Sequence, residues 1–322
     1  MNTEPKVSIL IPTFNRSGLL KGAIDSALAQ TYCNLEVVVA DNASTDNTPA
    51  VAAGYANDSR FIYFRNSSNI GMVRNWRKAL LEYAAGEWFL ILSDDDLLLD
   101  PDYIKEAVGL ISEFPGTVLV YANGYRRTGD ADTPLALPFD GVLNGKTVFL
   151  TRDAVGPQDF MLCNVLFNRA LAIGLGAFSN EHNIACDSEL FLKMCLSGDV
   201  GFIKKPVSAY RIHANNLIRS YASDADLLIN HIEWFARPYE MAVKGGLFTT
   251  EELALWRRRV VIGQLINTYK CIIFRHRKDF LRLTRAMIEK SGISTREFLH
   301  INLIILFHAV LKFFSGRWFK IL

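Results

Sequence analysis

Short apolar runs alternate with helical stretches over the first hundred residues. The runs 6–12 (KVSILIP) and 35–41 (LEVVVAD) are apolar without a polar period, which is typical of strands buried on both faces. Between them, residues 17–30 carry apolar side chains three and four positions apart, as an amphipathic helix does. The alternation continues with strands expected at 60–66 and 88–92 and a helix at 73–86. This order predicts an α/β fold with a doubly wound, mostly parallel sheet and helices on both faces.

The pattern is less regular after residue 116. Strands are expected at 117–126 and 200–213, with a helix at 187–198 between them. From residue 222 onward the chain has helical spacing and no strand pattern. We therefore predict two parts: an α/β domain at 1–221 and a helical C-terminal region at 222–322.

Polar residues follow three of the predicted parallel strands. In a doubly wound sheet, the carboxyl ends of the strands meet at one edge, and ligands bind there. We therefore expect the polar groups at these ends to lie close together. They are Pro12, Thr13, Asn15 and Arg16 after the first strand, Asp41 at the end of the second, and Asp94, Asp95 and Asp96 after the run 88–92.

Three consecutive carboxylates repel one another unless they face a cation. Mg²⁺ and Mn²⁺ prefer oxygen ligands and bridge to phosphate oxygens. The turn after the first strand, PTFNRSG, has no G-x-G-x-x-G, and the chain has no P-loop, so another way of holding phosphates is needed. The alternative is a solvated turn in which Ser93 or an aspartate caps the next helix.

Two more residues extend this set. The carboxylate of Asp41 could accept a hydrogen bond from the imide N–H of a uracil or thymine ring, or it could simply stabilise a turn. Arg74, at the start of the helix 73–86, could add positive charge near a phosphate, or it could be an ordinary surface arginine.

Four segments together resemble a known family. VSILIPTFNR, LEVVVADNASTDNT, NIGMVRNWRKALLEYAAGEWFLILSDDDLL and ACDSELFLKMCLSG are similar, in order and over about 210 residues, to the motifs of family-2 glycosyltransferases of the GT-A fold. The resemblance implies a nucleotide-diphospho-sugar transferase. It places Pro12, Thr13, Asn15 and Arg16 in the nucleoside pocket and Asp41 at the base.

The same resemblance assigns the acidic residues. The segment SDDD stands at the family's metal motif with Ser93 in place of the first carboxylate. This departure favours Asp95 as the principal metal ligand and Asp94 as a contact to the ribose or a second metal, with Asp96 as a further metal candidate. The cofactor implied is Mg²⁺ or Mn²⁺.

CDSEL stands at the family's E-D-x-x-L segment, which makes Asp187 the general base that removes the acceptor proton in an inverting displacement. Cys186 replaces the usual glutamate. Without the resemblance, the sequence favours a different interpretation, in which Asp187 simply caps the helix 187–198.

The stretch YRIHANNLIRS resembles the family's segment near the donor diphosphate. It makes Arg211 and Arg219 candidates for phosphate contacts and His213 a candidate for completing the metal shell, although a single histidine can also be structural. The Q-x-x-R-W motif of processive synthases is absent, which favours transfer of one or a few sugars.

The predicted function is transfer of a sugar from a UDP- or dTDP-sugar to a hydroxyl of a glycan or lipid-linked acceptor, in the synthesis of a cell-surface polysaccharide. One alternative is a non-catalytic scaffold that binds sugar nucleotides or glycans. Another is a related nucleotidyltransferase, but the missing glycine-rich loop disfavours it. No nucleic-acid partner is expected, and an oligomer is compatible with the sequence.

Charge is unevenly distributed although the formal net charge is only +2. From residue 222 onward there are about 16 Lys and Arg against 9 Asp and Glu. The segment 297–322 has an apolar core of about 14 residues, short of the roughly 20 that span a bilayer. It suits a helix lying in the interface of an anionic membrane, or a helix packed on the catalytic domain or a second subunit.

Five scattered cysteines without a C-x-x-C pair argue against a disulfide framework or a zinc knuckle. The N-terminus has no secretory signal pattern. We expect a cytoplasmic protein, with peripheral contact to the inner face of the cytoplasmic membrane through the C-terminal segment.

Overall fold

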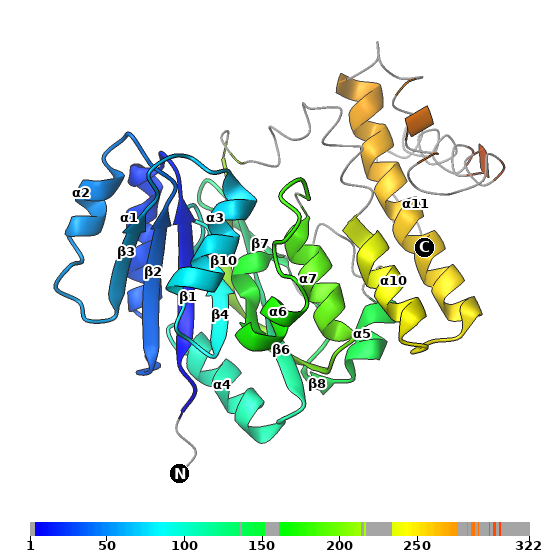
Figure 1. Cartoon of the computed structure of the whole chain (residues 1–322), viewed down its shortest axis with the longest axis horizontal. Helices are drawn as coiled ribbons and strands as arrows, with labels where there is room; N and C mark the ends of the chain where they lie inside the picture. The colour runs from blue at the N-terminus through cyan, green and yellow to red at the C-terminus, as the bar shows by residue number, and fades with distance from the viewer. Residues whose placement is uncertain are drawn as a thin grey trace. The chain divides into compact units, whose positions relative to one another are not determined.

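A computed structural model describes residues 4–135, 137–151, 161–183, 185–213, 216 and 234–275, and single positions between 282 and 303 (Figure 1). These residues form two compact units. The first contains the described residues up to Phe149 and from Met161 to His213, and the second contains the others. The predicted boundary between 221 and 222 falls in a stretch outside the described residues, so it stays a prediction.

The first unit is built on a ten-stranded sheet with the order β3-β2-β1-β4-β9-β6-β10-β5, to which β7 adds beside β6 and β8 beside β10. Pairings show that β1, β2, β3, β4, β6 and β10 run in one direction and the other strands run opposite. The prediction of a mostly parallel α/β sheet is confirmed. The strands are β1 Val7–Thr13, β2 Leu35–Asp41, β3 Phe61–Arg65, β4 Trp88–Ile91, β5 Leu97–Leu98, β6 Thr117–Thr128, β7 Ala131–Leu135, β8 Gly141–Leu143, β9 Val165–Asn168 and β10 Asp199–Ile212.

Helices cover both faces of this sheet, as predicted. On one face α1 and α4 join a core that includes Ile9, Val37 and Leu90. On the other face α7 packs on β6, where the rings of Phe191 and Tyr121 meet edge-on at 6.2 Å. The helices of this unit are α1 Ser17–Leu28, α2 Thr48–Ala53, α3 Met72–Lys78, α4 Tyr103–Glu113, α6 Arg169–Gly174 and α7 Cys186–Cys195, with α5 Gly145–Thr151 across the unit boundary, a π-helical turn at Ala79–Tyr83 and a 3-10 turn at Leu162–Asn164.

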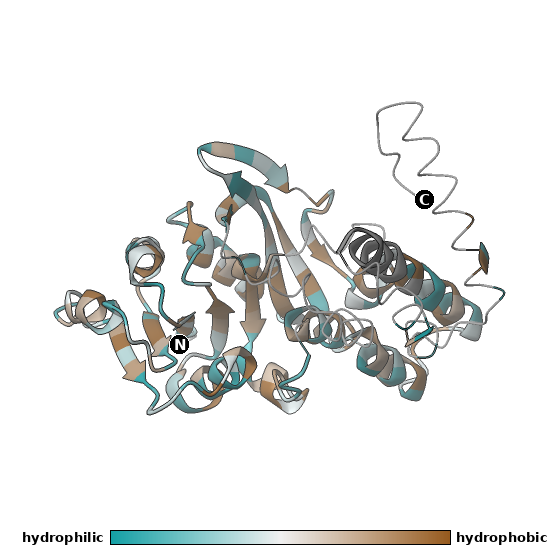
Figure 2. Cartoon of the chain, turned by 90° about the horizontal axis from the view of Figure 1, so that it is seen from above, coloured by the Kyte–Doolittle hydropathy of each residue, from teal (hydrophilic) through white to brown (hydrophobic). Residues whose placement is uncertain are grey.

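Apolar spacing explains these elements. Every residue of β2 is buried, as expected of a strand covered on both faces. In α1 the buried side chains Leu20, Ala23, Ile24 and Ala27 recur three and four apart, and Figure 2 shows helices with alternating hydrophobic and hydrophilic segments. The N-cap of α1 is Arg16, and the N–H of Ser17, the first residue of the helix, donates to Asp46 Oδ2 at 2.9 Å.

Strand β10 carries the irregularity that brings its end to the site. Its pairing with β6 shifts register on both sides of Pro206. Proline has no N–H for the ladder, and bulges of this kind bend a strand and redirect its side chains. The bend lies just before Arg211 and His213, which sequence periodicity alone could not place.

A buried charge lies on β2, the second strand from one edge of the sheet. Glu36 on β2 is only 2% exposed. Its carboxylate accepts hydrogen bonds from the Ser8 hydroxyl at 2.5 Å and the Ala85 N–H at 2.7 Å, and its other oxygen lies 2.6 Å from Lys6 Nζ. These partners tie β2 to β1 and to the turn before β4, so Glu36 stabilises the sheet.

The second unit is helical where it is described. It contains α10 (Ala236–Lys244) and α11 (Thr250–Arg275), which pack through an aromatic cluster of Phe235, Tyr239 and Trp256. Among the described residues, none of the helices has the length and hydrophobicity needed to cross a bilayer. The predicted interfacial helix at 297–322 lies almost entirely outside the described residues.

Candidate active site

The three consecutive aspartates follow β4 at the carboxyl edge of the sheet. All three are buried, with 2 to 5% of each residue exposed. The backbone turns here, since the Asp96 N–H donates to the Ser93 carbonyl at 3.0 Å. The solvated turn that the sequence left open as an alternative is therefore not what forms, because these carboxylates lie inside the protein.

Positive groups from two distant segments face the aspartates. Arg16 Nη1 donates to Asp94 Oδ1 at 3.1 Å and to Asp95 Oδ2 at 2.6 Å. His213 Nε2 lies 3.0 Å from the same oxygen of Asp95. The structure thus brings together residues from after β1, after β4 and after β10.

Arg211 connects the cluster to β10 mainly through backbone groups. Its N–H donates to Asp96 Oδ1 at 3.0 Å, and its guanidinium donates to the carbonyls of Asp95 and Leu19. Asp96 therefore fixes the end of β10, and the Arg211 side chain bridges two loops at the sheet edge.

Burial and mutual repulsion affect the protonation of this cluster. Burial raises the pKa of Asp94 to about 6, with a further increase from Asp95 and a partial decrease from Arg16. The pKa of Asp96 is well above its usual range, because of burial and then the charge of Asp95. For Asp94 and Asp96, burial and the neighbouring carboxylates thus outweigh the effect of Arg16 and Arg211.

The donor atoms fit a divalent cation that brings other ligands with it. In the described part of the chain, no group of three or more His, Cys, Asp or Glu is arranged to hold a metal ion. Mg²⁺, however, is usually held by one or two carboxylates together with substrate phosphates and water. Here Asp95 Oδ2 could provide one carboxylate ligand, and His213 Nε2, 3.0 Å from it, could provide a nitrogen ligand.

Asp41 is fully buried and its carboxylate already has partners. Oδ1 accepts the Ser44 N–H at 2.8 Å, and Oδ2 accepts the Tyr63 hydroxyl at 2.6 Å and lies 3.3 Å from Arg65 Nε. Tyr63 and Arg65 come from β3, and sequence analysis did not identify them. What could have identified them in the sequence is that both are polar residues in the otherwise apolar strand FIYFR.

The loops beside Asp41 are held in unusual backbone conformations. Asn15 has φ 54° and Ala43 has φ 65°, a region that side-chain-bearing residues rarely adopt. Asn15 N–H donates to the Ser44 hydroxyl at 2.9 Å, and Asn15 Oδ1 accepts the Thr45 N–H at 2.7 Å. Strain of this kind is concentrated at functional sites, and here it lies where the nucleoside pocket was predicted.

Pro12 and Thr13 end β1 directly beside the end of β2. Thr13 pairs with Asp41 in the sheet register, and its carbonyl accepts the Asn42 N–H at 2.9 Å. Pro12, Thr13 and Asn15 therefore lie at the same edge of the sheet as Asp41, as we predicted from the positions of the strand ends.

Asp187 lies in the first turn of α7. The N-cap of this helix is Ala185, so the alternative that Asp187 caps it was wrong; Asp187 Oδ1 accepts the neighbouring Ser188 N–H at 2.6 Å. Buried polar bonds fix the helix: Asn183 Nδ2 donates to Glu189 Oε2 at 2.5 Å, and Glu189 Oε1 lies 2.5 Å from Lys193 Nζ.

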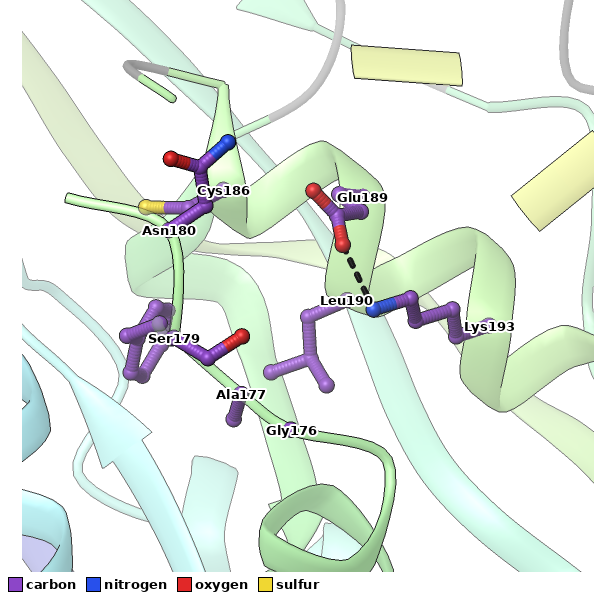
Figure 3. Close-up of a pocket in the computed structure, with 9 residues that line it drawn as sticks. Gly176, Ala177, Ser179, Asn180, Cys186, Glu189, Leu190 and Lys193 are labelled. Atoms are coloured by element: carbon purple, nitrogen blue, oxygen red, sulfur yellow. Dashed lines mark ion pairs between the residues drawn. The ribbon is translucent and has the colours of Figure 1, made fainter. Parts of the chain in front are cut away.

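A small hollow with a cavity volume of about 10 Å³ lies between this helix and the loop 176–180 (Figure 3). Glu189 and Lys193 point toward one another at its edge. Ligand pockets for small molecules are usually about 300–1,000 Å³, so this hollow is too small for a nucleotide sugar.

One predicted phosphate contact lies away from the acidic cluster, and another is outside the described residues. Arg74 on α3 is exposed and pairs with Glu181 in the loop before α7. Arg219 lies outside the described residues. Sequence analysis also did not identify Arg16 as the partner of Asp94 and Asp95, because 78 and 79 residues separate them.

Comparison with known families gives one clear match. The model of "Glycosyl transferase family 2" matches residues 8–171, about half of the chain. The match covers the strands β1 to β4 and the acidic cluster.

Curated relatives carry matching names. A protein of Rickettsia typhi named uncharacterized glycosyltransferase RT0329 is 33% identical over 38% of this chain and 37% of its own length. A protein of Campylobacter jejuni named GalNAc(5)-diNAcBac-PP-undecaprenol beta-1,3-glucosyltransferase is 38% identical over 30% of this chain and 31% of its own length. The putative colanic acid biosynthesis glycosyl transferase WcaA of Escherichia coli is 29% identical over 60% of this chain and 67% of its length. The chain thus spans about a third of the length of the first two relatives.

Solved structures share the fold. TarS of S. aureus, residues 1–349 with UDP, has a TM-score of 0.56 at 15% identity, covering 98% of this chain and 93% of its own. The mannosyltransferase PcManGT of Pyrobaculum calidifontis, solved with GDP-Man and Mn²⁺, has a TM-score of 0.57 at 19% identity, covering 98% and 89%. Both are GT-A glycosyltransferases, so the predicted fold class is confirmed.

Proposed function

Because the chain belongs to glycosyl transferase family 2, we propose that it moves a sugar from a UDP- or dTDP-sugar to a hydroxyl of a glycan or lipid-linked acceptor, with inversion. The acidic cluster carries this proposal. Its buried Asp94, Asp95 and Asp96 face Arg16 and His213 at the edge where a donor diphosphate would lie. A role in cell-surface polysaccharide synthesis is supported by the names of the Campylobacter and Escherichia relatives.

The nucleoside would bind at the strained loops 12–16 and 41–45. Asp41 has no exposed surface, so a direct hydrogen bond to the base requires Tyr63 or Arg65 to shift. We propose that Asp41 orders the loop around Ser44. After such a shift, its carboxylate would also accept a hydrogen bond from the imide N–H of the base. UDP in the TarS structure supports a nucleotide at this fold.

Asp95 and His213 would hold Mg²⁺ or Mn²⁺ with the diphosphate oxygens. Mn²⁺ in the PcManGT structure supports a divalent ion in this fold. A bound ion offsets the negative charge that grows on the departing diphosphate. Asp94 remains the candidate for the ribose. For Asp96 we propose a role in positioning β10 rather than direct metal contact, which is supported by the bond from the Arg211 N–H.

Asp187 would accept the proton of the acceptor hydroxyl. It is half-buried in the first turn of a helix whose position is fixed by Asn183, Glu189 and Lys193, so its carboxylate is held by a rigid element. The proton passes from the acceptor oxygen to Asp187 as that oxygen attacks the anomeric carbon and the diphosphate leaves from the opposite face.

Release of nucleotide diphosphate tests the donor. The protein is incubated with Mn²⁺ and a panel of UDP-, dTDP- and GDP-sugars, with and without a lipid-linked or glycan acceptor. We expect acceptor-dependent release with one UDP- or dTDP-sugar. Release only from a GDP-sugar would contradict the donor class, and no release from any of them would contradict the transferase proposal.

The variant Asp187→Asn tests the base. It keeps the size of the side chain but removes the proton acceptor, so we expect transfer to fall by about 10²- to 10⁴-fold while the nucleotide still binds. Ser188→Ala is a matched control on the same helix turn. Full transfer by Asp187→Asn, or loss of nucleotide binding, would count against the assignment.

Peripheral membrane contact is tested by deleting residues 299–322. The basic and aromatic composition of this segment supports binding to anionic vesicles. We expect the full chain, but not the deletion variant, to sediment with such vesicles in low salt. Equal partitioning of both would contradict membrane contact through this segment.

A further inference from the structure

Arg16 lies against Asp95, the carboxylate that is the proposed metal ligand. Its Nη1 lies 2.6 Å from Asp95 Oδ2, and His213 Nε2 lies 3.0 Å from that same oxygen. Arg16 also bonds Asp94, so one guanidinium pairs with two of the three carboxylates and offsets part of their charge. Asp95 and His213, the two proposed metal ligands, thus already contact each other, and Asp95 is also paired with the positive charge of Arg16.

A metal ion and Arg16 cannot share this oxygen without strong repulsion. A divalent ion binds a carboxylate oxygen at about 2.1 Å. With Arg16 Nη1 at 2.6 Å from Asp95 Oδ2, the two cationic groups would lie within about 5 Å of each other. One of them has to move.

Arg16 is built so that its side chain can move while its backbone stays in place. Its carbonyl accepts the N–H groups of Leu19 and Leu20 at 2.9 and 3.0 Å, which anchors it as the N-cap of α1. Its side chain is 21% exposed, whereas those of Asp94 and Asp95 are 6 and 7% exposed. The Arg16 side chain is therefore partly exposed to solvent, whereas the carboxylates that it bonds are buried.

We propose that Arg16 is an exchangeable counter-cation: it pairs with Asp94 and Asp95 in the empty protein and leaves Asp95 when the metal enters with the donor. The released guanidinium then has the donor diphosphate as its partner, for which its planar fork is suited. Metal binding without nucleotide is weakened by Arg16, and metal binding with nucleotide is strengthened by it. This inference rests on the proposed function, because it takes the nucleotide–metal donor as the ligand.

The test measures Mn²⁺ affinity by electron paramagnetic resonance in wild type and Arg16→Gln, without nucleotide. Removing a competing charge-assisted bond should make Mn²⁺ bind about tenfold more tightly to Arg16→Gln. Arg60→Gln is the matched control, since Arg60 pairs with Asp58 at the surface and should leave the affinity unchanged. Adding Asp95→Asn to Arg16→Gln should remove the tight binding, which assigns it to this site.

A second measurement adds UDP. The gain in Mn²⁺ affinity on adding UDP should be larger in wild type than in Arg16→Gln, because only wild type gains the contact between Arg16 and the diphosphate. Thermal unfolding checks that Arg16→Gln is folded, and Mn²⁺ alone should raise its Tm more than that of wild type.

The outcomes separate this inference from the proposed function. Equal or weaker Mn²⁺ binding by Arg16→Gln, with UDP and Mn²⁺ still binding to wild type, overturns the role of Arg16 alone. No Mn²⁺ binding to either protein, with or without UDP, overturns the metal-assisted function together with this inference.

Discussion

Glu36 and the cluster Asp94–Asp96 are both buried carboxylates of the same sheet, but their surroundings differ. Glu36 has three donors of its own: Lys6, Ser8 and the Ala85 N–H. Burial acts to raise its pKa, but these donors outweigh burial and hold the pKa below its usual range. In the cluster, by contrast, burial raises the pKa of Asp94 to about 6.

The difference distinguishes a structural charge from a functional one. A buried carboxylate with sufficient donors contributes to stability, because breaking the arrangement leaves polar groups unpaired. Three adjacent carboxylates with too few positive partners cost stability until a cation binds. Excess negative charge at a strand end therefore indicates a ligand site.

The largest expected effect comes from Asp95→Asn. Without this carboxylate the metal loses its principal ligand, so we expect transfer to fall by at least about 100-fold. Tm should stay the same or rise, because one of three repelling charges is removed. Asp58→Asn, a surface change, is the control. A large drop in Tm would show that Asp95 is structural like Glu36.

Glu36→Ala should have the opposite profile. It leaves the Ser8 hydroxyl and the Ala85 N–H without their acceptor, which should cost about 2–4 kcal/mol of unfolding free energy. The rate of transfer per folded molecule should be unchanged. Denaturant unfolding measures the loss, with the exposed Glu113→Ala as control. If transfer falls while stability is kept, Glu36 belongs to the site instead.

Glu36→Gln tests the charge alone through pH. The folded-state pKa of Glu36 lies below its ordinary value of 4.5, so the stabilisation is complete above pH 4.5 and is lost as the pH falls through the folded-state pKa. The advantage of wild type over Glu36→Gln should therefore be constant from pH 7 to 5 and shrink below that. Unfolding free energies measured from pH 7 to 3 check this, and a difference that does not change with pH would contradict it.

The smallest effect is expected from Lys6→Met. The Lys6 side chain is 39% exposed, so water screens its ion pair with Glu36 and the loss should be at most about 1 kcal/mol. Unfolding in low and high salt measures it, and the cost should decrease with salt. A loss as large as that of Glu36→Ala would mean that Lys6, rather than Ser8 and Ala85, stabilises Glu36.

Part of this contrast could be predicted from the sequence. The strands, the helices between them and the position of the aspartates at a strand end followed from apolar spacing, since the pattern of burial repeats with the period of each element. Glu36 is a charged residue within the otherwise apolar run LEVVVAD, and its structural role was not predicted from the sequence. Its partners Ser8 and Ala85 are 28 and 49 residues away, so no local pattern identifies them.

The antiparallel part of the sheet was also missed. Strand β9 inserts between β4 and β6, and short strands add at β5, β7 and β8. These strands have only two to five residues, which is too few for a periodic signal. They form because neighbouring strands offer unpaired backbone groups, which depends on the completed sheet.

By itself the sequence determined the order of the parallel strands and the helices between them, the family motifs and the edge of the sheet where polar groups gather. These follow from local hydrophobic periodicity and from residue types at strand ends. Only the tertiary structure decided which charges meet: Arg16 with Asp94 and Asp95, Arg211 with Asp96, and His213 with Asp95. Such pairs depend on the register of strands and on the bend of β10 at Pro206, which arise from packing between segments more than 70 residues apart.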